Sequence, residues 1–383
     1  MRLSELTGLL DSWYAPAWAE PWDRVGLVCG DPDQEVRRIL FAVDPVEQVV
    51  DEALEHGADL IVVHHPLLLT PVSSVAATTA KGRVLHRLVR GGVALFTAHT
   101  NADVPEHGVN DAIARALGLR DARVLHPSDG AGLDKLVTFV PTDAAERVRR
   151  ALADAGAGGI GAYDSCSFTT VGEGRFRPLS GADPTVGAVG RLEVVPEVRV
   201  EVVAARGRRS EVVRALLAAH PYEEPAYDVV ELADLPHPPT TGAPPSVRGH
   251  GRVGRLEQAM NLRQFADHVA GALPTTAHGV RVAGDPDRMV ETVGVGAGSG
   301  ESLLEDARHA GCDVFVTSDL KHHRASEFLE EGGPALVDVA HWAAEWAWLP
   351  VVEGLVREAA SAMGDTVDTR VSTTVTDPWT FRA

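Results

Sequence analysis

The sequence predicts an α/β protein in which two outer segments form one domain around an inserted α+β domain. Strand-like and helix-like segments alternate at both ends of the chain, a pattern typical of right-handed βαβ units and a largely parallel sheet. A degenerate repeat of strand, helix and strand lies between these ends. The length of 383 residues also favours more than one domain, since domains usually hold about 100–200 residues.

The first outer segment contains three short apolar runs that predict buried strands, each followed by a helix with apolar residues at helical spacing. The strands are expected at Arg38–Asp44, Asp59–Val63 and Val93–Ala98, and the helices at Pro45–His56, Lys81–Arg90 and Val109–Leu117. Asp44 is suited to be the N-cap of its helix and Pro45 the first helical residue.

The second outer segment repeats this pattern. Strands are expected at Thr292–Val295, Val314–Thr317 and Ala335–Val339, with one helix from Ser302 and another that carries Trp342, Trp346 and Trp348. The Gly-rich run Gly294–Gly300 lacks the Gly-Lys-Ser/Thr of a Walker loop. A tight turn from strand to helix explains it better than a phosphate site, although a helix N-terminus could bind an anion.

The middle of the chain predicts a ferredoxin-like α+β sandwich. Each half of the repeat reads as a strand, a helix and a second strand, namely Leu136–Val140, Ala145–Ala155 and Ala162–Asp164, then Val198–Val203, Ser210–Ala219 and Ala226–Asp228. Pro-, Gly- and Ser-rich stretches flank it at His126–Gly132 and Leu235–Gly251. We therefore expect an outer domain of residues 1–128 and 250–383, an inserted domain of residues 132–236 and a linker of residues 237–249.

Composition excludes several classes of partner. Lys and Arg number 35 and Asp and Glu 54, so the net charge is -19, which disfavours broad binding to nucleic acid or to an anionic membrane surface. The chain has no apolar run of about 18 residues and no signal-peptide pattern at its N-terminus. Its three cysteines are widely scattered, which indicates neither a disulfide framework nor a CxxC zinc site. We expect a cytoplasmic protein.

Five metal-binding side chains follow predicted strands. His64 and His65 end one strand, Asp103 follows the next, and His341 and Glu345 come after a third. Ligands of open α/β sheets bind at this carboxyl edge, and residues four apart share a helical face.

Each of these five residues also has an ordinary structural explanation. A histidine at a strand end is often a hydrogen-bonded core residue, Asp103 could be an N-cap, and the His341–Glu345 spacing is common on solvated helices. Three imidazoles and two carboxylates together suit Zn, Fe or Mn. Five ligands exceed one tetrahedral site, so we expect two divalent ions per chain, about 3.5–4 Å apart.

A second polar group follows the Val314–Thr317 strand. Asp319 and His323 are predicted to act beside the metals, either by orienting a ligand or as general acid or base. A polar helix start explains the same residues equally well. Lys321 could contact an anionic substrate or extend into water.

Taken in order, these motifs resemble the dinuclear-metal-centre family of GTP cyclohydrolase I type 2 homologues, in its long bacterial form. The shared segments are Trp22–Leu27, His64–Leu67, His99–Asp103, Gly296–Gly300, Thr317–His323, the His341/Glu345 pair and, in the middle, His220–Asp228. The resemblance covers nearly the whole chain.

The resemblance implies that His64, His65, Asp103, His341 and Glu345 are the metal ligands, with Glu345 as a bridge. It also implies a toroidal homohexamer and a PII-like inserted domain. The chain departs from the family at Ala340 and Ala344, where relatives often have Gly and Ser, and at Ser318, where Gly is common. These departures concern the shape of the pocket and not the ligands.

The leading hypothesis is a dinuclear-metal-dependent hydrolase that uses metal-bound hydroxide to attack a nucleotide such as GTP or a related heterocycle. The sequence contains no recognisable nucleobase-binding motif. The alternative is a non-catalytic metal-binding hexamer that buffers, delivers or senses metal. A third hypothesis is an interaction scaffold in which the metals only stabilise the fold.

Overall fold

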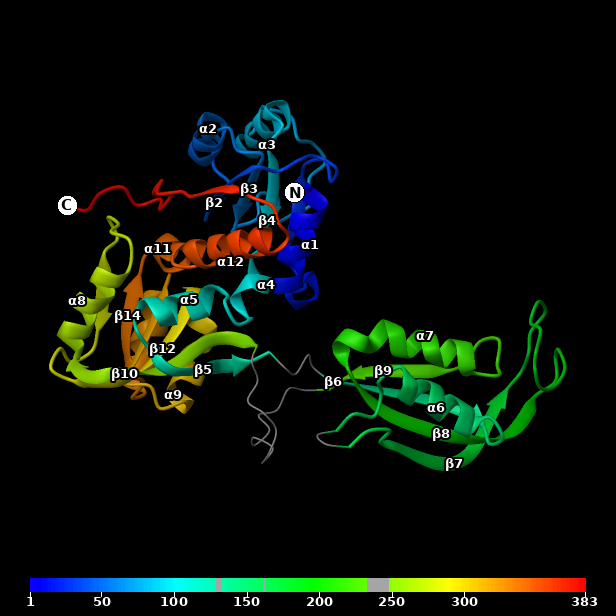
Figure 1. Ribbon diagram of the computed structural model, residues 1–383. Coiled ribbons are helices and arrows are strands. Elements are labelled where there is room, and N and C mark those ends of the chain that lie inside the picture. Colours follow the sequence, from blue (N-terminus) through cyan, green and yellow to red (C-terminus); the bar gives the residue numbers. More distant parts are fainter. Residues whose placement is uncertain (129–132, 161–162, 233–247) are drawn as a thin grey trace. The chain divides into compact units, whose positions relative to one another are not determined.

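The computed structural model describes residues 1–128, 133–160, 163–232 and 248–383 (Figure 1). Contacts divide the chain into two compact units, one of residues 1–128 with 246–383 and one of residues 129–245. Each unit is described here by itself. None of the helices in the described ranges is long and apolar enough to span a bilayer.

The first sheet of the outer unit has five strands in the order β1-β4-β3-β2-β15. Their bounds are β1 Gly26–Cys29, β2 Arg38–Ala42, β3 Leu60–Val63, β4 Ala94–Thr97 and β15 Asp368–Val371. Only β1 runs antiparallel to its neighbour, and the other three pairings are parallel. The central strands β3 and β4 are buried along their full length, as parallel strands covered on both faces must be.

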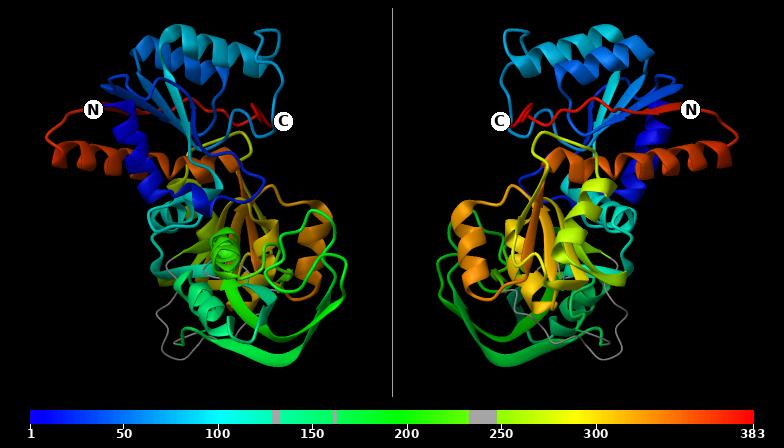
Figure 2. Two further views of the ribbon diagram at one scale, coloured as in Figure 1. Left: turned by 90° about the vertical axis from the view of Figure 1, so that its right-hand side faces the viewer. Right: turned by 90° about the vertical axis from the view of Figure 1, so that its left-hand side faces the viewer.

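Helices cover both faces of this sheet. Their bounds are α1 Leu3–Trp13, α2 Glu47–His56, α3 Ala80–Gly91 and α12 Leu349–Ala362. Side chains of α1 and α12 pack on one face, whereas α2 and α3 lie side by side on the other (Figures 1 and 2). Gly57 and Gly92 end α2 and α3 in the left-handed conformation, which glycine adopts without a steric penalty.

The second sheet has six strands in the order β11-β14-β13-β12-β10-β5. Their bounds are β5 Arg120–Pro127, β10 Gly249–Asn261, β11 Val280–Ala283, β12 Met289–Ser299, β13 Val314–Ser318 and β14 Ala335–Val339. The β12, β13 and β14 pairings are parallel and the others antiparallel. The α/β fold class is confirmed, but the outer unit contains two sheets where the sequence analysis expected one.

Helices also cover both faces of the six-stranded sheet. Side chains of α5 (Val109–Ala116), α8 (Leu262–Ala272) and α11 (His341–Trp346) join the core that both sheets share. Those of α9 (Leu304–His309) and α10 (His322–Glu330) pack on the opposite face. The expected Trp-bearing helix is divided, because α11 ends at Trp346 and α12 begins after Trp348.

The inserted unit has the predicted ferredoxin-like order of elements. The elements are β6 Leu133–Pro141, α6 Ala145–Asp154, β7 Ser167–Phe176, β8 Glu193–Ala205, α7 Arg209–Ala219 and β9 Tyr227–Glu231. Their antiparallel sheet has the order β7-β8-β6-β9, and both helices pack on one of its faces.

In the middle of the chain, one strand begins later than expected and part of the expected sequence lies outside the described residues. The second strand of the first repeat begins at Ser167, later than the expected Ala162–Asp164, because Tyr163 forms only an isolated bridge to Ile160. Ala162 itself lies outside the described residues, as do residues 237–247 of the expected linker.

A buried arginine joins the two halves of the outer unit. Arg252 on β10 is 3% exposed and pairs with Asp111 on α5. Its guanidinium also donates to the carbonyl oxygens of Val104 and Pro105, at 3.2 and 2.9 Å. These partners precede the insert in sequence, so one side chain holds together segments that the insert separates.

We predict that Arg252→Met lowers the free energy of unfolding of the outer unit by about 3 kcal/mol, because it removes the buried guanidinium that pairs with the partly buried Asp111 and donates to several carbonyl groups. Arg255→Met is the control, since Arg255 on the same strand is 59% exposed and pairs only at the surface with Glu291, which is worth about 0–1 kcal/mol. All seven tryptophans lie outside residues 129–245, so urea unfolding followed by tryptophan fluorescence reports on this unit alone. Equal losses in the two variants would contradict the prediction.

Candidate metal centre

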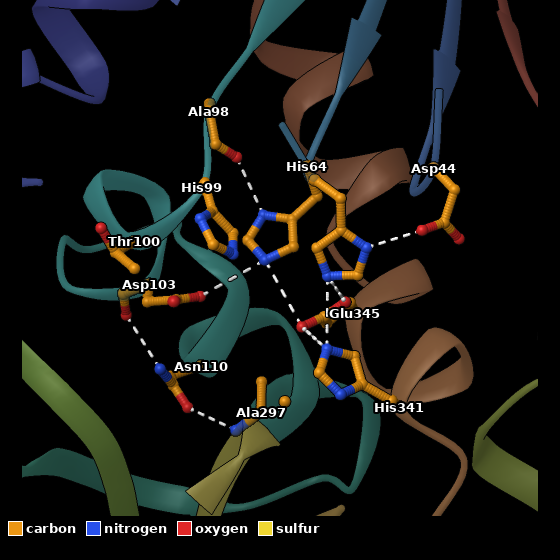
Figure 3. A network of polar contacts seen from close by, with 12 residues as sticks. Asp44, His64, Ala98, His99, Thr100, Asp103, Asn110, Ala297, His341 and Glu345 are labelled. Carbon is orange, nitrogen blue, oxygen red and sulfur yellow. Dashed lines mark hydrogen bonds and ion pairs between the residues drawn. The ribbon is translucent and has the colours of Figure 1, made fainter. Parts of the chain in front are cut away.

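Both sheets of the outer unit contribute to one cluster of histidines and carboxylates (Figure 3). His64 and His65 directly follow β3, and Asp103 ends the short helix α4 (Thr100–Asp103) after β4. His341 and Glu345 lie on α11, which follows β14 of the other sheet. The structure therefore brings together all five residues that the sequence analysis proposed as ligands.

Glu345 lies at the centre of the cluster and is 3% exposed. Its Oε1 atom is 2.8 Å from Nε2 of His341 and 3.5 Å from Nε2 of His64. Its Oε2 atom is 2.9 Å from Nε2 of His65. The two oxygens of one carboxylate thus face three imidazole rings.

Asp103 and His99 complete the cluster on the side of the five-stranded sheet. Asp103 Oδ1 lies 3.8 Å from His64 Nε2. Ligand atoms of His64, His65 and His99 lie within 4.8 Å of one another, as do those of His65, His341 and Glu345. The sequence analysis did not select His99, although it stands in the His99–Asp103 segment.

The buried His64 and its neighbour His65 are oriented through their Nδ1 atoms. His64 Nδ1 is 2.8 Å from the carbonyl oxygen of Ala98, which can only accept a hydrogen bond. His65 Nδ1 is 2.7 Å from Asp44 Oδ1. With the Nδ1 proton donated outward, the Nε2 lone pair of each neutral ring points into the cluster.

The same arrangement recurs at the other two imidazoles. His99 Nδ1 lies 2.8 Å from Asp23 Oδ1, and His341 Nδ1 lies 2.7 Å from Asp319 Oδ2. A carboxylate or carbonyl behind the outer ring nitrogen is the usual support of metal-binding histidines, since it fixes the tautomer and the ring orientation.

The residues of the cluster fit a cation. His65 Nε2 and His341 Nε2 are 3.3 Å apart, so in the neutral rings two lone pairs face each other and a carboxylate. Glu345 Oε2 is buried and has no hydrogen-bond partner of suitable geometry among the described residues, despite its proximity to His65. Converging acceptors of this kind repel one another unless a positive charge lies among them. Imidazole and carboxylate donors suit Zn, Fe or Mn.

When no metal ion is bound, protons on the histidines supply the positive charge that the cluster needs. Burial lowers the pKa of His65 and His341, but the Glu345 carboxylate and the hydrogen bonds that the rings donate to Asp44 and Asp319 outweigh it. The pKa of His65 is raised well above its ordinary value, and that of His341 is raised to about 10. Burial raises the pKa of Glu345, but the surrounding imidazoles hold it well below its ordinary value.

The remaining two groups shift towards their neutral forms. Burial lowers the pKa of His64, which keeps its ring uncharged. Burial and the nearby Glu345 charge raise the pKa of Asp103 well above its usual range. Bound metal ions would displace these protons, because ligands bind in their deprotonated forms.

The Gly-rich run approaches the cluster as part of a strand. Gly298 lies in β12 with φ +65°, and a Cβ atom there would be 2.8 Å from Glu345 Oε1. Thr317 holds the segment by accepting from the Gly300 N–H at 2.9 Å and donating to the Gly298 carbonyl at 3.2 Å. The run therefore gives the Glu345 side chain room, and the turn expected after Val295 begins only after Ser299.

The structure separates the two residues predicted to act beside the metals. Asp319 has φ 58°, which Asp tolerates better than most residues, and its carboxylate supports His341. His323 is exposed, and its described ring contact is with His322 at 5.2 Å. Within the described residues it forms no hydrogen bond or ion pair with the five candidate ligands, so its catalytic role stays a prediction.

Asp44 has a different role from the one expected. The helix begins at Glu47 with Val46 as its N-cap, and the Asp44 side chain instead accepts from His65 and from Thr376. Sequence reasoning missed Asp44 and Asp23 as supports. The available signal was their position, since Asp44 ends a predicted strand and Asp23 lies in the Trp22–Leu27 segment.

Two tryptophans border the cluster in different ways. Trp348 is fully buried and its ring centroid is 5.6 Å from that of His64. Trp22 is 54% exposed, with its ring edge-on to His99 at 5.9 Å. Asp23 fixes the Trp22 segment by accepting from Thr100 N at 3.0 Å as well as from His99, so an exposed indole is held beside the histidines.

Comparisons with known proteins place the chain in a family. Residues 1–378 match the model of the Duf34/NIF3 (NGG1p interacting factor 3) family. The chain belongs to the Duf34/NIF3 family. A Mycobacterium tuberculosis relative called GTP cyclohydrolase 1 type 2 homolog is 48% identical over 380 residues, covering 99% of this chain and 97% of its own. A Bacillus subtilis protein of the same name is 37% identical, covering 98% of both chains.

Solved structures of the Duf34/NIF3 family share the fold. A crystal structure of a Bacillus cereus protein related to NIF3 is similar with a TM-score of 0.67 and 37% identity, covering 100% of this chain and 99% of its own. The family resemblance expected from the sequence motifs is confirmed.

We predict that Asp319→Asn and Asp44→Asn each weaken zinc binding by about 10–100-fold, because each removes the negative charge that makes a ligating imidazole more basic. Competition with a chromogenic chelator measures this affinity. Asp51→Asn is the control, since the Asp51 side chain is 56% exposed and pairs with Arg87 at the surface. Unchanged zinc affinity in both Asp44 and Asp319 variants would show that these carboxylates do not support metal ligands.

Proposed function

We propose that this protein is a dinuclear-metal-dependent hydrolase that acts on a nucleotide or a related heterocycle. The observation that carries the proposal is the orientation of Glu345, whose two carboxylate oxygens face different histidines, His341 and His64 on one side and His65 on the other. A carboxylate in this position suits a bridge between two ions.

The residues divide into two groups around this bridge. His64 and Asp103 would hold one ion, since Asp103 Oδ1 lies 3.8 Å from His64 Nε2. His65 and His341 would hold the other. His99 could add a further ligand, since a ring nitrogen of His99 lies within 4.8 Å of ligand nitrogens of His64 and His65. Zn, Fe and Mn all accept such donors.

A pair of divalent ions supplies Lewis acidity and lowers the pKa of water at the site. The chain itself contributes orientation, since Asp44, Asp319 and Asp23 fix three imidazoles and leave their Nε2 atoms directed inward. Asp319 is also partly exposed, with 55% of its side chain accessible. The Asp319 carboxylate could therefore transfer protons between His341 and water or a bound substrate.

Trp22 is the residue that favours a planar substrate. Its exposed indole lies beside His99 and is anchored through Asp23. Aromatic side chains bind heterocycles by stacking, a contribution of about 1–3 kcal/mol per base. The name of the curated relatives refers to GTP cyclohydrolase, and hydrolytic opening of the guanine ring of GTP is the reaction we propose to test first.

The proposal includes a homohexamer in the cytoplasm. The hexamer rests on the family resemblance, and the mass in solution from analytical ultracentrifugation tests it. The compartment rests on three free cysteines, Cys29, Cys166 and Cys312, as is usual in reducing environments.

We predict that the protein reconstituted with Mn, Fe(II) or Zn consumes GTP and that Glu345→Ala abolishes turnover together with binding of at least one ion. The reason is that the Glu345 carboxylate contacts His64, His65 and His341. Mass-resolved chromatography identifies a ring-opened or formate-releasing product, and metal analysis counts the ions. Glu358→Ala, an exposed change on α12, is the control.

The outcomes separate the hypotheses. Full activity of metal-depleted Glu345→Ala protein would rule out the metal-dependent mechanism. Two bound ions per chain without any product over a broad nucleotide panel would reject hydrolysis, and reversible metal exchange would then support the alternative of a metal-buffering or metal-sensing hexamer. Chelation that only lowers the melting temperature would indicate a structural role of the metals.

We also predict that Trp22→Ala raises KM for the nucleotide about tenfold or more and that Trp22→Phe restores most of the loss, because phenylalanine keeps a stacking surface. Metal content should stay at the wild-type level, since Trp22 offers no ligand atom to the cluster. Steady-state kinetics with parallel metal analysis measures both quantities. A fall in kcat with unchanged KM would contradict a stacking role.

A further inference from the structure

The inserted unit contains a cavity that is separate from the metal centre. Its volume is about 850 Å³, within the range of about 300–1,000 Å³ that is typical of small-molecule sites. It is lined by Phe139 of β6, by β7 and β8, and by residues of two loops, 177–186 and 222–226. A smaller cavity of about 310 Å³ shares Thr185, Val186 and Tyr222 with it.

The cavity lies on the face of the sheet that carries no helix. Phe139 pairs with Arg199, and Pro141 with Glu197, between β6 and β8. Paired residues point to the same face, and their sequence neighbours point to the other. Since the alternate residues of β8, such as Val198 and Val200, pack against α6 and α7, Phe139 and Glu197 face away from the helices.

The two loops are fastened to each other over this face. Thr185 donates to the carbonyl oxygen of Pro221 at 2.7 Å, and the Asp183 N–H donates to Glu223 Oε2 at 2.9 Å. These bonds link residues about 40 positions apart in sequence. The cavity is therefore a built structure and not a gap beside a single loop.

A buried histidine sets the position of Tyr222. His220 Nε2 is 3.0 Å from the carbonyl oxygen of Phe139, which fixes the proton on Nε2. Its Nδ1 atom then accepts from the Tyr222 N–H at 3.1 Å. These contacts give the His-Pro-Tyr part of the His220–Asp228 segment a structural role within the inserted unit.

Tyr222 in turn contacts a buried carboxylate. Its hydroxyl donates to Glu197 Oε1 at 2.8 Å, and Glu197 is 7% exposed. Gly174 makes room for this carboxylate, since a Cβ atom there would lie 2.1 Å from Glu197 Oε2. Across the described residues, no Lys, Arg or His side chain forms an ion pair with Glu197.

Glu197 therefore has acceptor capacity that the protein leaves unused. A carboxylate accepts about four hydrogen bonds, and a buried carboxylate normally has charged or multiple donors. The walls beside it are aromatic, with Phe139 lining the cavity and Phe176 edge-on to Tyr222 at 5.6 Å. A molecule bound in this cavity could supply further donors to Glu197, and it would lie beside these aromatic rings.

We propose that this cavity binds a planar nitrogen heterocycle that presents adjacent N–H donors to Glu197, as the N1–H and the exocyclic amino group of guanine do. Aromatic surfaces hold the ring, and the carboxylate selects for the donor edge. Adenine presents an acceptor at the corresponding ring nitrogen, which the carboxylate repels. The site uses none of the metal ligands.

The mouth of the cavity favours an anionic group on the same molecule. Arg177 lines it, is exposed and forms no hydrogen bond or ion pair with other described residues. Arg175 and Arg199, which also line it, already pair with Glu173 and Glu201. A phosphate next to the ring would meet the guanidinium of Arg177, so a nucleotide should bind more tightly than its nucleoside.

Isothermal titration calorimetry of the full-length, zinc-loaded protein with guanosine 5′-monophosphate tests the proposal. We expect one site per chain in the inserted unit and an affinity about 10–100-fold lower in Glu197→Gln, because the amide replaces a charged acceptor by a donor. Adenosine 5′-monophosphate should bind at least tenfold more weakly than the guanine nucleotide, and guanosine should lose affinity relative to its monophosphate.

Variants separate this site from the metal centre and from unfolding. Binding that persists in Glu345→Gln arises outside the metal centre. Glu211→Gln makes the same change on the exposed surface of α7 and should leave affinity at the wild-type level. Gly174→Ala displaces the Glu197 carboxylate without altering its charge and should also weaken binding, with far-UV circular dichroism as the check on folding. Absence of binding, equal affinity for the two monophosphates or an unaffected Glu197→Gln protein would overturn the proposal.

Discussion

The candidate metal centre depends on one constraint, which is that the buried carboxylate of Glu345 needs positive charge around it. A carboxylate removed from water is strongly unfavourable unless it is paired. Here it is surrounded by imidazole nitrogens that carry no proton in their neutral form, since their outer nitrogens donate to Ala98, Asp44 and Asp319. Either additional protons or metal ions must supply the charge. The pKa values of His65 and His341 are raised, so without a metal ion these two rings hold an additional proton and supply the positive charge.

The candidate metal centre draws its residues from both sheets. His64 and His65 come from the five-stranded sheet, whereas His341 and Glu345 come from a helix on the six-stranded sheet. Neither sheet holds a complete ligand set, so the centre exists only where the shared core keeps both sheets together. Asn110 strengthens this connection, since its side chain donates to the Asp103 carbonyl at 2.9 Å and accepts from the Ala297 N–H at 2.8 Å (Figure 3). One amide thereby links the Asp103 helix to the strand that approaches Glu345.

The sequence predicted what depends on local pattern and missed what depends on contacts between distant segments. Buried strands and the polar residues that end them are visible as apolar runs followed by His or Asp, which is why His64 and Asp103 could be selected. The division into two sheets could not be predicted, because βαβ periodicity is the same whether strands join one sheet or two. Asp44 is an example of a residue whose role the sequence could not predict. Its position before Pro45 is typical of an N-cap, and only the folded structure shows that its side chain accepts a hydrogen bond from His65.

The same physical principle distinguishes the two sites of this chain. Both contain a buried glutamate, 3% exposed at Glu345 and 7% at Glu197, and in both a glycine leaves room for the carboxylate. Their surroundings differ in kind. Nitrogen lone pairs surround Glu345 and exclude any partner except a proton or a metal ion. A phenol and aromatic rings surround Glu197 (Tyr222, Phe139 and Phe176), and they provide neither a metal-ligating nitrogen nor a compensating charge. The chemistry of the neighbours is therefore the basis on which we propose inorganic cations for the first carboxylate and an organic hydrogen-bond donor for the second.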